Sequence, residues 1–454
     1  MEAENQAKYI VAVVGAGPAG LFASRQLAAD GARVVLINRD IKPGGLAEYG
    51  IYPSKHKMKE GLRKQFRQIL QIPEIEYYGN VSVGQAGDLS LSDLRAAGFQ
   101  AVLVAAGAQG TKWLGLPGEE LSRGVYHAKD LVYHYNKLPP YSQQEFHIGR
   151  RVALIGVGNV MLDIASWLIR QLKVDEVTAI ARRGPAEVKF DKKEMESVIA
   201  NLDLKALDKE IARVAPVMES LGQDVEAAKA YILSALPKAE EPVSISRFQL
   251  EFLASPNRIL GDAHGQVCGL EIEETTLKPK NGDTQAIGTG VKRIMDVDTV
   301  IFCIGDRVDD AFGLPVQWNE FVKNPHPGYS ADGISYEAFD PERGAPIEGV
   351  FVAGWSREAS SGLVGVARKD GERGAKAVLE YLQTLPSLEN LEVILESFRE
   401  ALFQLGKLVV TKEDIARLEA VEQAEAVKRG LEEFKFSSNQ EMLEIIALAQ
   451  AAQR

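Results

Sequence analysis

Two glycine-rich turns carry the residues of this sequence whose types and spacing could do chemistry. Gly15, Gly17 and Gly20 form a Gly-x-Gly-x-x-Gly pattern within VAVVGAGPAG, and RVALIGVGNVMLD repeats its first two glycines at Gly156 and Gly158. Each turn follows an apolar run and precedes a helical pattern. This order predicts a strand, a tight turn and a helix N-terminus that binds a pyrophosphate. Two such sites predict a flavin and a nicotinamide in one chain, with direct hydride transfer that needs no catalytic acid, base or nucleophile.

The apolar runs around the first turn predict the elements that position it. Tyr9–Val14 and Ala32–Ile37 have the composition of buried parallel strands, and Leu21–Ala29 has the apolar spacing of a connecting helix. Asn38 follows the second strand, where an acidic residue usually binds the ribose hydroxyls of a dinucleotide. An amide both donates and accepts hydrogen bonds, so we expect Asn38 to bind the ribose without adding charge.

The second turn differs from the usual pattern and is followed by two arginines. Met161 stands where a small residue is expected, and Arg182 and Arg183 come directly after the predicted strand that begins at Glu176. Planar, permanently charged guanidinium groups at this place suit a 2′-phosphate, which favours NADP over NAD. The alternative is a pair of arginines on a solvated loop.

The remaining chain supplies further strands and helices. Small residues end the apolar runs Phe99–Ala108, Asp298–Val308 and Gly349–Trp355, which permits a ligand to approach the backbone. A charged, Ala- and Leu-rich stretch between Asp191 and Glu241 reads as helical. Residues 247–300 read as antiparallel strands joined by Asn-Gly and Gly-Asp turns.

This order predicts the fold class and the domains. We expect an α/β protein with two Rossmann-like dinucleotide-binding domains, the NADP domain inserted into the FAD domain, and a C-terminal helical extension after Pro386. The expected FAD domain comprises residues 1–109 and 332–454. The expected NADP domain comprises residues 110–331.

Composition excludes several other classes of protein. The chain has 454 residues, 46% of them hydrophobic, and a net charge of −11, which argues against nucleic acid as a partner. Cys268 and Cys303 form no Cys-x-x-Cys motif, and the histidines show no metal-ligand spacing, so we expect neither an active disulfide nor a metal site. No apolar run approaches the ~20 residues of a membrane span. Without a signal-peptide pattern, we expect a cytoplasmic protein.

One basic segment stands out on this acidic chain. Lys55–Gln68 carries six Lys or Arg residues against one Glu. The segment from Lys55 to Arg67 is therefore a candidate docking site for an acidic electron-carrier protein. The alternative is a solvated helix face.

Taken together, the motifs resemble the adrenodoxin reductase-type ferredoxin–NADP+ reductases, which are glutathione reductase-like flavoproteins. The resemblance covers almost the whole chain and is most specific in RRGPAEVKFDKKEM at Arg182–Met195. Other segments that carry it are listed here: VVGAGPAG, PGGLAEYGIYPSKHKMK, LGLPGEEL, GNVMLDIA, GW…SGLVG and VTKEDIARLEAVEQAEAVKRG.

The resemblance implies a set of cofactor-binding residues. Those expected to bind FAD are Gly15, Gly17, Ala19, Gly20, Asn38, Leu46, Val83, Gly354, Trp355, Gly362, Leu363 and Val364. Those expected to bind NADP(H) are Gly156, Val157, Gly158, Asn159, Val160, Arg182, Arg183 and Glu194. Gly362 is expected where the nicotinamide meets the flavin ring.

The sequence departs from the family pattern around both cofactors. Asn38 replaces a glutamate, Met161 replaces a small residue, and the family's Pro-Asp-His reads Pro53-Ser54-Lys55. The stretch usually written Gly-Pro-Thr-Gly reads Ala359-Ser360-Ser361-Gly362. These changes suggest a divergent branch with a different acceptor or a poorer nicotinamide reaction.

The resemblance implies an enzyme that passes electrons between NADPH and a one-electron carrier such as ferredoxin or flavodoxin, through FAD. Two alternatives remain at this point. One is a flavin subunit of a larger complex, although such subunits typically carry cysteine clusters. The other is a flavoprotein with an impaired nicotinamide reaction that acts as an interaction or sensor module.

Overall fold

The computed structural model describes residues 8–360 and 362–451, and it divides the chain into two units. The first unit contains the residues up to Lys112, Tyr133–Gln143 and the chain from Gly305 onward. The second unit contains Trp113–Val132 and Gln144–Ile304. The second unit is therefore inserted into the first, as the sequence predicts.

The second boundary differs from the expected one. Residues 305–331, which we expect in the second unit from the sequence, lie in the first. The physical reason is burial, because Val308, Phe312 and Phe321 pack into the hydrophobic core of the first unit. Residues 305–331 contain no long apolar run from which the sequence could show that they belong to the first unit. Residues 133–143 also lie in the first unit, because Tyr133 and Leu138 pack against Tyr49 of that unit.

A six-stranded sheet organises the first unit, in the order β19-β20-β4-β1-β2-β3. All neighbours pair in parallel except the β19–β20 hairpin. The strands are β1 (Tyr9–Val14), β2 (Ala32–Ile37), β3 (Ile75–Tyr78), β4 (Ala101–Val104), β19 (Glu337–Asp340) and β20 (Ala345–Val352). Strands β1 and β2 have the bounds predicted from their apolar runs.

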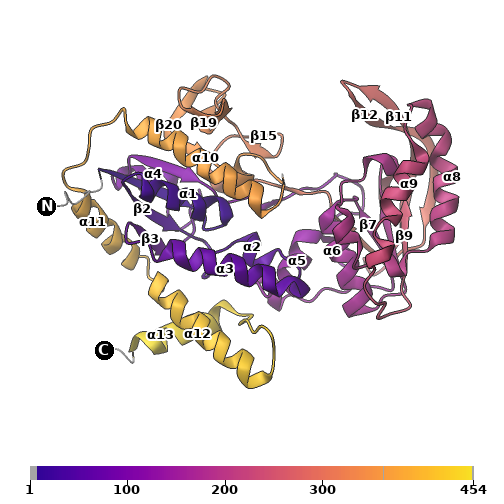
Figure 1. The fold of residues 1–454 in the computed structure, drawn as a ribbon, viewed down its shortest axis with the longest axis horizontal. Coiled ribbons are helices and arrows are strands. Elements are labelled where there is room, and N and C mark those ends of the chain that lie inside the picture. Colours follow the sequence, from indigo (N-terminus) through magenta and orange to yellow (C-terminus); the bar gives the residue numbers. More distant parts are fainter. Residues whose placement is uncertain (1–7, 361, 452–454) are drawn as a thin grey trace. The chain divides into compact units, whose positions relative to one another are not determined.

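Helices α1 (Pro18–Ala29) and α10 (Val364–Leu382) lie side by side against this sheet (Figure 1). Other helices of the unit are α2 (Leu46–Tyr49), α3 (His56–Leu70) and α4 (Leu91–Ala96). The predicted C-terminal extension consists of α11 (Leu391–Phe403), α12 (Lys412–Arg429) and α13 (Asn439–Ala451). Leu418, Met442 and Ile446 of this extension are buried in the core that α1 shares.

A five-stranded parallel sheet organises the second unit, in the order β6-β13-β7-β8-β9. Its strands are β6 (Val125–His127), β7 (Arg151–Ile155), β8 (Glu176–Ile180), β9 (Arg247–Glu251) and β13 (Thr299–Phe302). The helices include α6 (Asn159–Trp167), α7 (Lys192–Met195), α8 (Leu204–Ser220) and α9 (Val225–Leu233). Helix α5 (Ala128–Tyr135) lies where the chain passes between units.

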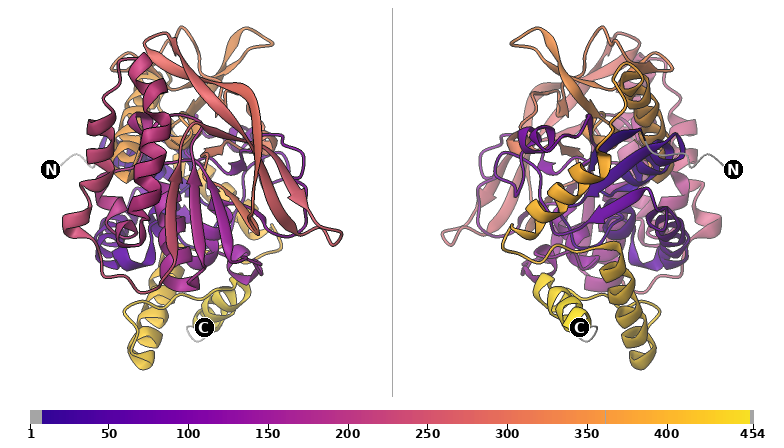
Figure 2. Two further views of the ribbon diagram at one scale, coloured as in Figure 1. Left: turned by 90° about the vertical axis from the view of Figure 1, so that its right-hand side faces the viewer. Right: turned by 90° about the vertical axis from the view of Figure 1, so that its left-hand side faces the viewer.

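The predicted antiparallel strands form a separate three-stranded sheet in the second unit. They are β10 (Ala254–Gly261), β11 (Val267–Lys280) and β12 (Asp283–Met295), and the long β11–β12 hairpin is visible in Figure 2. Asn281 has φ 49° and Gly282 has φ 80°. A two-residue hairpin turn of this type requires positive φ at both positions. The Asn-Gly signal in the sequence therefore predicts this turn correctly.

Candidate functional site

The first glycine turn has three glycines with three different roles. Gly15 has φ +104°, and a Cβ on it would lie 2.4 Å from the Ala105 carbonyl oxygen. A Cβ on Gly20 would lie 1.9 Å from the Gly15 carbonyl oxygen, whereas a Cβ on Gly17 would meet nothing within 4 Å. Gly15 and Gly20 thus permit close packing of backbone. Gly17 leaves open space beside the turn, where a pyrophosphate could approach.

Helix α1 begins at this open space without a side-chain cap. Gly17 occupies its N-cap in extended conformation and makes no capping hydrogen bond, and Pro18 follows. The first N–H groups of a helix have no partner within the helix and carry a partial positive charge. The turn therefore has the geometry and the donors that a dinucleotide phosphate requires.

Close packing brings the end of β20 to the same turn. Gly354 has φ +64°, and its Cβ would lie 2.6 Å from the Ala19 side chain. The segment Gly354–Ser356 is held by Asp370, whose carboxylate accepts the Gly354 N–H at 2.6 Å and hydrogen bonds from Nε and Nη2 of Arg357. Ala19 is buried and Trp355 is half-buried. The structure thus brings Gly354 to Ala19, and Trp355 follows Gly354 in the chain. Their contact with FAD stays a prediction.

Asn38 lies at the end of β2, as expected, but its side chain is engaged within the protein. It is 7% exposed, and its Oδ1 accepts the Ala16 N–H at 3.0 Å. Its Nδ2 donates to the carbonyls of Asp40 and Lys42 at 2.9 and 3.0 Å. Asn38 therefore ties the glycine turn to the following loop. Its binding of a ribose stays a prediction.

The loop after Asn38 packs directly on the glycine turn. A Cβ on Gly45 would lie 3.2 Å from the Gly17 Cα, and the Gly44 N–H donates to the Ala16 carbonyl at 2.7 Å. Leu46, predicted to line FAD, begins α2 directly after Gly45 and is half-buried. Val83, also predicted to line FAD, packs against the core of the same unit.

A buried ionic network fixes this loop from the other side, and sequence reasoning missed it. Lys42 pairs with Glu422 of α12 at 2.5 Å, and Glu48 pairs with Lys435 at 2.7 Å and with Arg63 at 2.6 Å. Burial alone would raise the pKa of Glu48, but the charges of Lys435, Lys42 and Arg63 outweigh it and hold the pKa far below its usual range. The C-terminal extension therefore supports the loop that contacts the glycine turn.

Ion pairs and hydrogen bonds within the fold engage several cations of the predicted docking segment. Lys59 is buried, where its ammonium donates to Asn136 at 2.8 Å, and Arg63 pairs with both Glu48 and Glu433. Arg67 pairs with Glu419 of α12 at 2.7 Å. These three cations therefore serve the fold rather than an external partner. Lys57 and Lys64 are exposed and stay candidates for docking.

The remaining predicted FAD residues lie at the N-terminus of α10. Gly362 has φ +71° and is exposed, Leu363 is the uncapped N-cap of the helix, and Val364 is its first residue. Ser360, which departs from the family pattern, has φ +55°. Its hydroxyl accepts the Asp306 N–H at 2.7 Å, so the serine stabilises the local fold. Ser361 lies outside the described residues. The expected nicotinamide contact at Gly362 stays a prediction.

The second glycine turn repeats the geometry of the first. Gly156 has φ +118°, and its Cβ would lie 2.5 Å from the Cys303 carbonyl oxygen, whereas a Cβ on Gly158 would meet nothing within 4 Å. Gly158 is the N-cap of α6 and makes no side-chain capping bond. Met161 is fully buried. This turn therefore keeps both the open space and the uncapped helix despite the methionine.

Neighbouring side chains hold this second turn in place. Asn159 exchanges two hydrogen bonds with Asp191, one to the carboxylate at 2.9 Å and one from the backbone N–H at 2.7 Å. The Lys189 N–H donates to the Val157 carbonyl at 3.0 Å. Val160 is 44% exposed at the start of the helix. Predicted NADP residues 157–160 are therefore together at one uncapped helix end.

Arg182 and Arg183 follow β8 but have different surroundings. Arg182 is exposed, whereas Arg183 donates to both carboxylate oxygens of Asp283 at 3.0 and 3.2 Å. Glu194 lies in the short helix α7 and is half-buried. The pair of arginines therefore presents one accessible guanidinium and one that already has an anionic partner.

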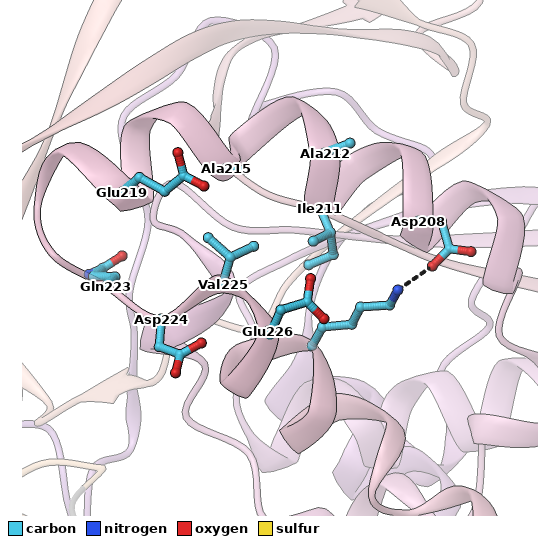
Figure 3. Close-up of a pocket in the computed structure, with 10 residues that line it drawn as sticks. Asp208, Ile211, Ala212, Ala215, Glu219, Gln223, Asp224, Val225 and Glu226 are labelled. Atoms are coloured by element: carbon cyan, nitrogen blue, oxygen red, sulfur yellow. Dashed lines mark ion pairs between the residues drawn. The ribbon is translucent and has the colours of Figure 1, made fainter.

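An acidic groove of about 460 Å³ opens elsewhere in the second unit, between α8 and α9 (Figure 3). Its lining includes Asp208, Glu219, Asp224 and Glu226, and Lys229 pairs with Asp208 at 2.8 Å. None of the residues predicted to bind a nucleotide lines this groove.

Two further properties of the described residues bear on the function. Among the described residues, no group of three or more His, Cys, Asp or Glu side chains could hold a metal ion. None of the helices described combines the length and apolar composition needed to cross a membrane.

Comparisons with known proteins agree with this geometry. Residues 9–205 match the family model described as pyridine nucleotide-disulphide oxidoreductase. The mitochondrial NADPH:adrenodoxin oxidoreductase of Arabidopsis thaliana is 29% identical over 389 residues, which cover 78% of each chain. The NADPH-ferredoxin reductase FprA of Mycobacterium tuberculosis is 28% identical over 417 residues, covering 82% of this chain and 84% of that one.

A solved structure shows the same fold. Mycobacterium tuberculosis FprA in complex with NADPH superposes with a TM-score of 0.79 at 24% identity, covering 97% of this chain and 99% of that chain. The fold, the two glycine turns and the match over residues 9–205 make this chain similar to the pyridine nucleotide-disulphide oxidoreductase class. Within that class, the chain is a relative of the adrenodoxin reductase-type ferredoxin–NADP+ reductases.

Proposed function

We propose that this chain is an FAD-dependent oxidoreductase that passes electrons between NADPH and a one-electron carrier protein of the ferredoxin or flavodoxin type. The observation that carries the proposal is the repeated turn: Gly17 and Gly158 each leave open space at an uncapped helix N-terminus. The relatives named as NADPH-dependent ferredoxin and adrenodoxin reductases support the same activity.

The residues of the first unit fit FAD. The pyrophosphate would lie at the N-terminus of α1, where Ala19 and Gly20 supply backbone N–H groups. Gly354 and Trp355 would border the cofactor, since Gly354 packs against Ala19. Bound FAD supplies the ability to accept two electrons as a hydride and to release them singly.

The residues of the second unit fit NADPH. The N-terminus of α6 would bind the pyrophosphate, and Arg182 and Arg183 would bind the 2′-phosphate through charge-assisted hydrogen bonds. The protein's part in the reaction is to bind and orient both dinucleotides, because the geometry of hydride transfer determines its rate.

An anaerobic titration tests the proposal. Purified protein reconstituted with FAD is titrated with NADPH and separately with NADH, and the flavin absorbance is followed. We expect rapid bleaching by NADPH, slower bleaching by NADH, and transfer from the reduced protein to an added ferredoxin or flavodoxin. FAD that stays oxidised with both nucleotides would reject the proposal.

The partner and the compartment belong to the same proposal. An acidic carrier fits the exposed cations Lys57 and Lys64 better than the whole basic segment, because Lys59, Arg63 and Arg67 have partners within the fold. A location in the cytoplasm is consistent with an NADPH-dependent reductase of this type. Fractionation of cells that express the protein, with detection of the protein in each fraction, tests the location.

A further inference from the structure

The tip of the β11–β12 hairpin carries an acidic residue in a fixed position. Asp283 is the first residue after the Asn281–Gly282 turn, and it pairs across the hairpin with Lys280. The Thr284 N–H donates to the Asp283 carboxylate at 2.8 Å. Register and turn geometry therefore fix the backbone that presents this carboxylate.

The hairpin is attached to the arginine loop by its neighbours. Thr284 donates to Glu187 at 2.6 Å, and Glu187 accepts the Gly184 N–H at 2.8 Å. Thr275 of β11 donates to the Arg182 carbonyl at 2.7 Å. These contacts hold the hairpin against the backbone of the loop without using the Arg183 side chain, so the loop does not depend on Asp283 for its position.

Asp283 is ionised and accessible where it meets Arg183. The Thr284 N–H, the Arg183 guanidinium and the charge of Lys189 all hold the pKa of Asp283 below its usual value. The Asp283 side chain is 68% exposed and that of Arg183 is 24% exposed. An exposed pair of this kind is weak enough for a stronger anion to displace it.

A 2′-phosphate would require the same guanidinium. It carries about two negative charges at neutral pH, so it would bind Arg183 more strongly than a single carboxylate does. Binding would still have to replace the Arg183–Asp283 pair and to place like charges close together. Both effects reduce the affinity for a nucleotide with a 2′-phosphate and leave one without it nearly unaffected.

Resting on the proposed function, we infer that Asp283 is a specificity-determining residue that competes with the 2′-phosphate of NADP(H) for Arg183. This competition lowers the affinity for NADP(H), while the affinity for NAD(H) stays the same. Asp283 acts from the hairpin tip and does not belong to the glycine turn or to the arginine loop.

Equilibrium binding to the FAD-loaded protein tests this inference. NADP+, NAD+ and adenosine 2′,5′-bisphosphate are titrated into wild type and Asp283→Asn by calorimetry. Asparagine keeps the shape and the acceptor for the Thr284 N–H. The matched control is Asp175→Asn, which removes an equal charge from the exposed Arg150–Asp175 pair. Asp175 lies just before the start of β8, whereas the arginine loop follows the end of that strand.

We expect Asp283→Asn to bind NADP+ and adenosine 2′,5′-bisphosphate about three- to tenfold more tightly at low ionic strength. The gain should shrink at high salt because the pair is exposed. NAD+ affinity and the control variant should stay at the wild-type value. In an Arg183→Ala background, most of the gain should disappear.

Different outcomes separate this inference from the proposed function. If wild type prefers NADP+ over NAD+ but Asp283→Asn binds NADP+ equally or more weakly, the inference is overturned alone. A gain that persists in full without Arg183 would also overturn it. Equal affinity of Asp283→Asn for NADP+ and NAD+ would overturn the NADP assignment, and this inference with it, because no competing carboxylate then remains.

Discussion

Gly371 of α10 packs so closely on Ala19 of α1 that a Cβ on Gly371 would lie 2.1 Å from the Ala19 carbonyl oxygen. This contact determines how near the two helices lie. It also bears on the cofactor site, because Ala19 is in the first turn of α1 and touches Gly354 at the end of β20. A helix contact within the core therefore supports the place where FAD would bind.

Adding one methyl group at this contact should weaken both stability and FAD binding. Gly371→Ala would force α10 away from α1, at a cost of about 1–3 kcal/mol for overpacking. Displacement of α1 would also disturb the pyrophosphate donors at its N-terminus. We expect a lower melting temperature and less FAD per protein after purification.

A matched variant distinguishes this effect from a general response to alanine. Gly61 lies in helix α3, where a Cβ would meet nothing within 4 Å. Gly61→Ala should raise stability by up to about 1 kcal/mol because alanine favours the helix. Normal FAD content in Gly371→Ala would show that the close contact is not needed.

Arg182 and Arg183 should contribute unequally to nucleotide preference. Arg182 is exposed, whereas the Arg183 guanidinium already binds Asp283. A hydrogen bond between charged groups contributes about 1.5–3 kcal/mol. We expect Arg182→Ala to weaken NADPH binding about ten- to a hundredfold, Arg183→Ala to weaken it less, and both to spare NADH.

Binding of NADPH and NADH by each variant, measured through flavin reduction, checks this difference. Arg150→Ala is the control, because Arg150 is exposed, pairs with Asp175 and precedes β7 rather than following β8. Equal losses of affinity for NADPH and NADH would show that this loop does not bind the 2′-phosphate.

Charge reversal of the exposed cations of α3 should affect only electron transfer to the protein partner. Lys57→Glu with Lys64→Glu should slow reduction of an acidic ferredoxin, most strongly at low salt, and spare reduction of a small dye. Arg63→Glu should instead destabilise the protein by about 3–5 kcal/mol, since it would remove one cation partner from buried Glu48 and half-buried Glu433 and place a third carboxylate beside them. Ferredoxin kinetics and thermal melting separate the two effects. An unchanged ferredoxin rate in the double variant would exclude α3 as a docking site.

The sequence predicts the local elements well and the distant contacts poorly. Runs such as Tyr9–Val14 are buried on both faces of a parallel sheet, so composition alone marks their bounds. The Asn281–Gly282 turn is equally local, because two positive φ angles require those residue types. In contrast, Lys42 and Glu422 are 380 positions apart. Nothing in the neighbourhood of either residue indicates that it is buried or paired.

The candidate site follows the same rule. Gly17 and Gly158 lie where the motif predicts, at open helix ends, because the turn is determined by adjacent residues. Arg183 was recognised from its position after β8, but its partner Asp283 is 100 positions away and comes to it only through the hairpin. The charge of Lys59 and Arg63 suggests a docking face, since composition does not show that both of them pair with Glu433.

Glu48 should make the stability of the protein depend on acid pH. Its pKa in the folded protein lies below the unfolded value of about 4.3, because Lys435, Lys42 and Arg63 outweigh the effect of burial. In the unfolded chain the carboxyl therefore takes up a proton first as the pH falls. The stabilisation that Glu48 provides is fully present above the unfolded pKa and is lost progressively below it.

Replacing the Glu48 carboxylate should show how much it contributes to the stability of the protein. Glu48→Gln should lower stability at neutral pH by about 3–5 kcal/mol, because Lys435 and Arg63 lose a buried partner. Its melting temperature should then fall less steeply than that of wild type between about pH 5 and pH 3. The control is Glu396→Gln in α11, an exposed carboxylate, which should follow the wild-type curve. Parallel curves for Glu48→Gln and wild type would mean that Glu48 is not the group whose protonation destabilises the protein, and that the attachment of the C-terminal extension does not depend on its charge.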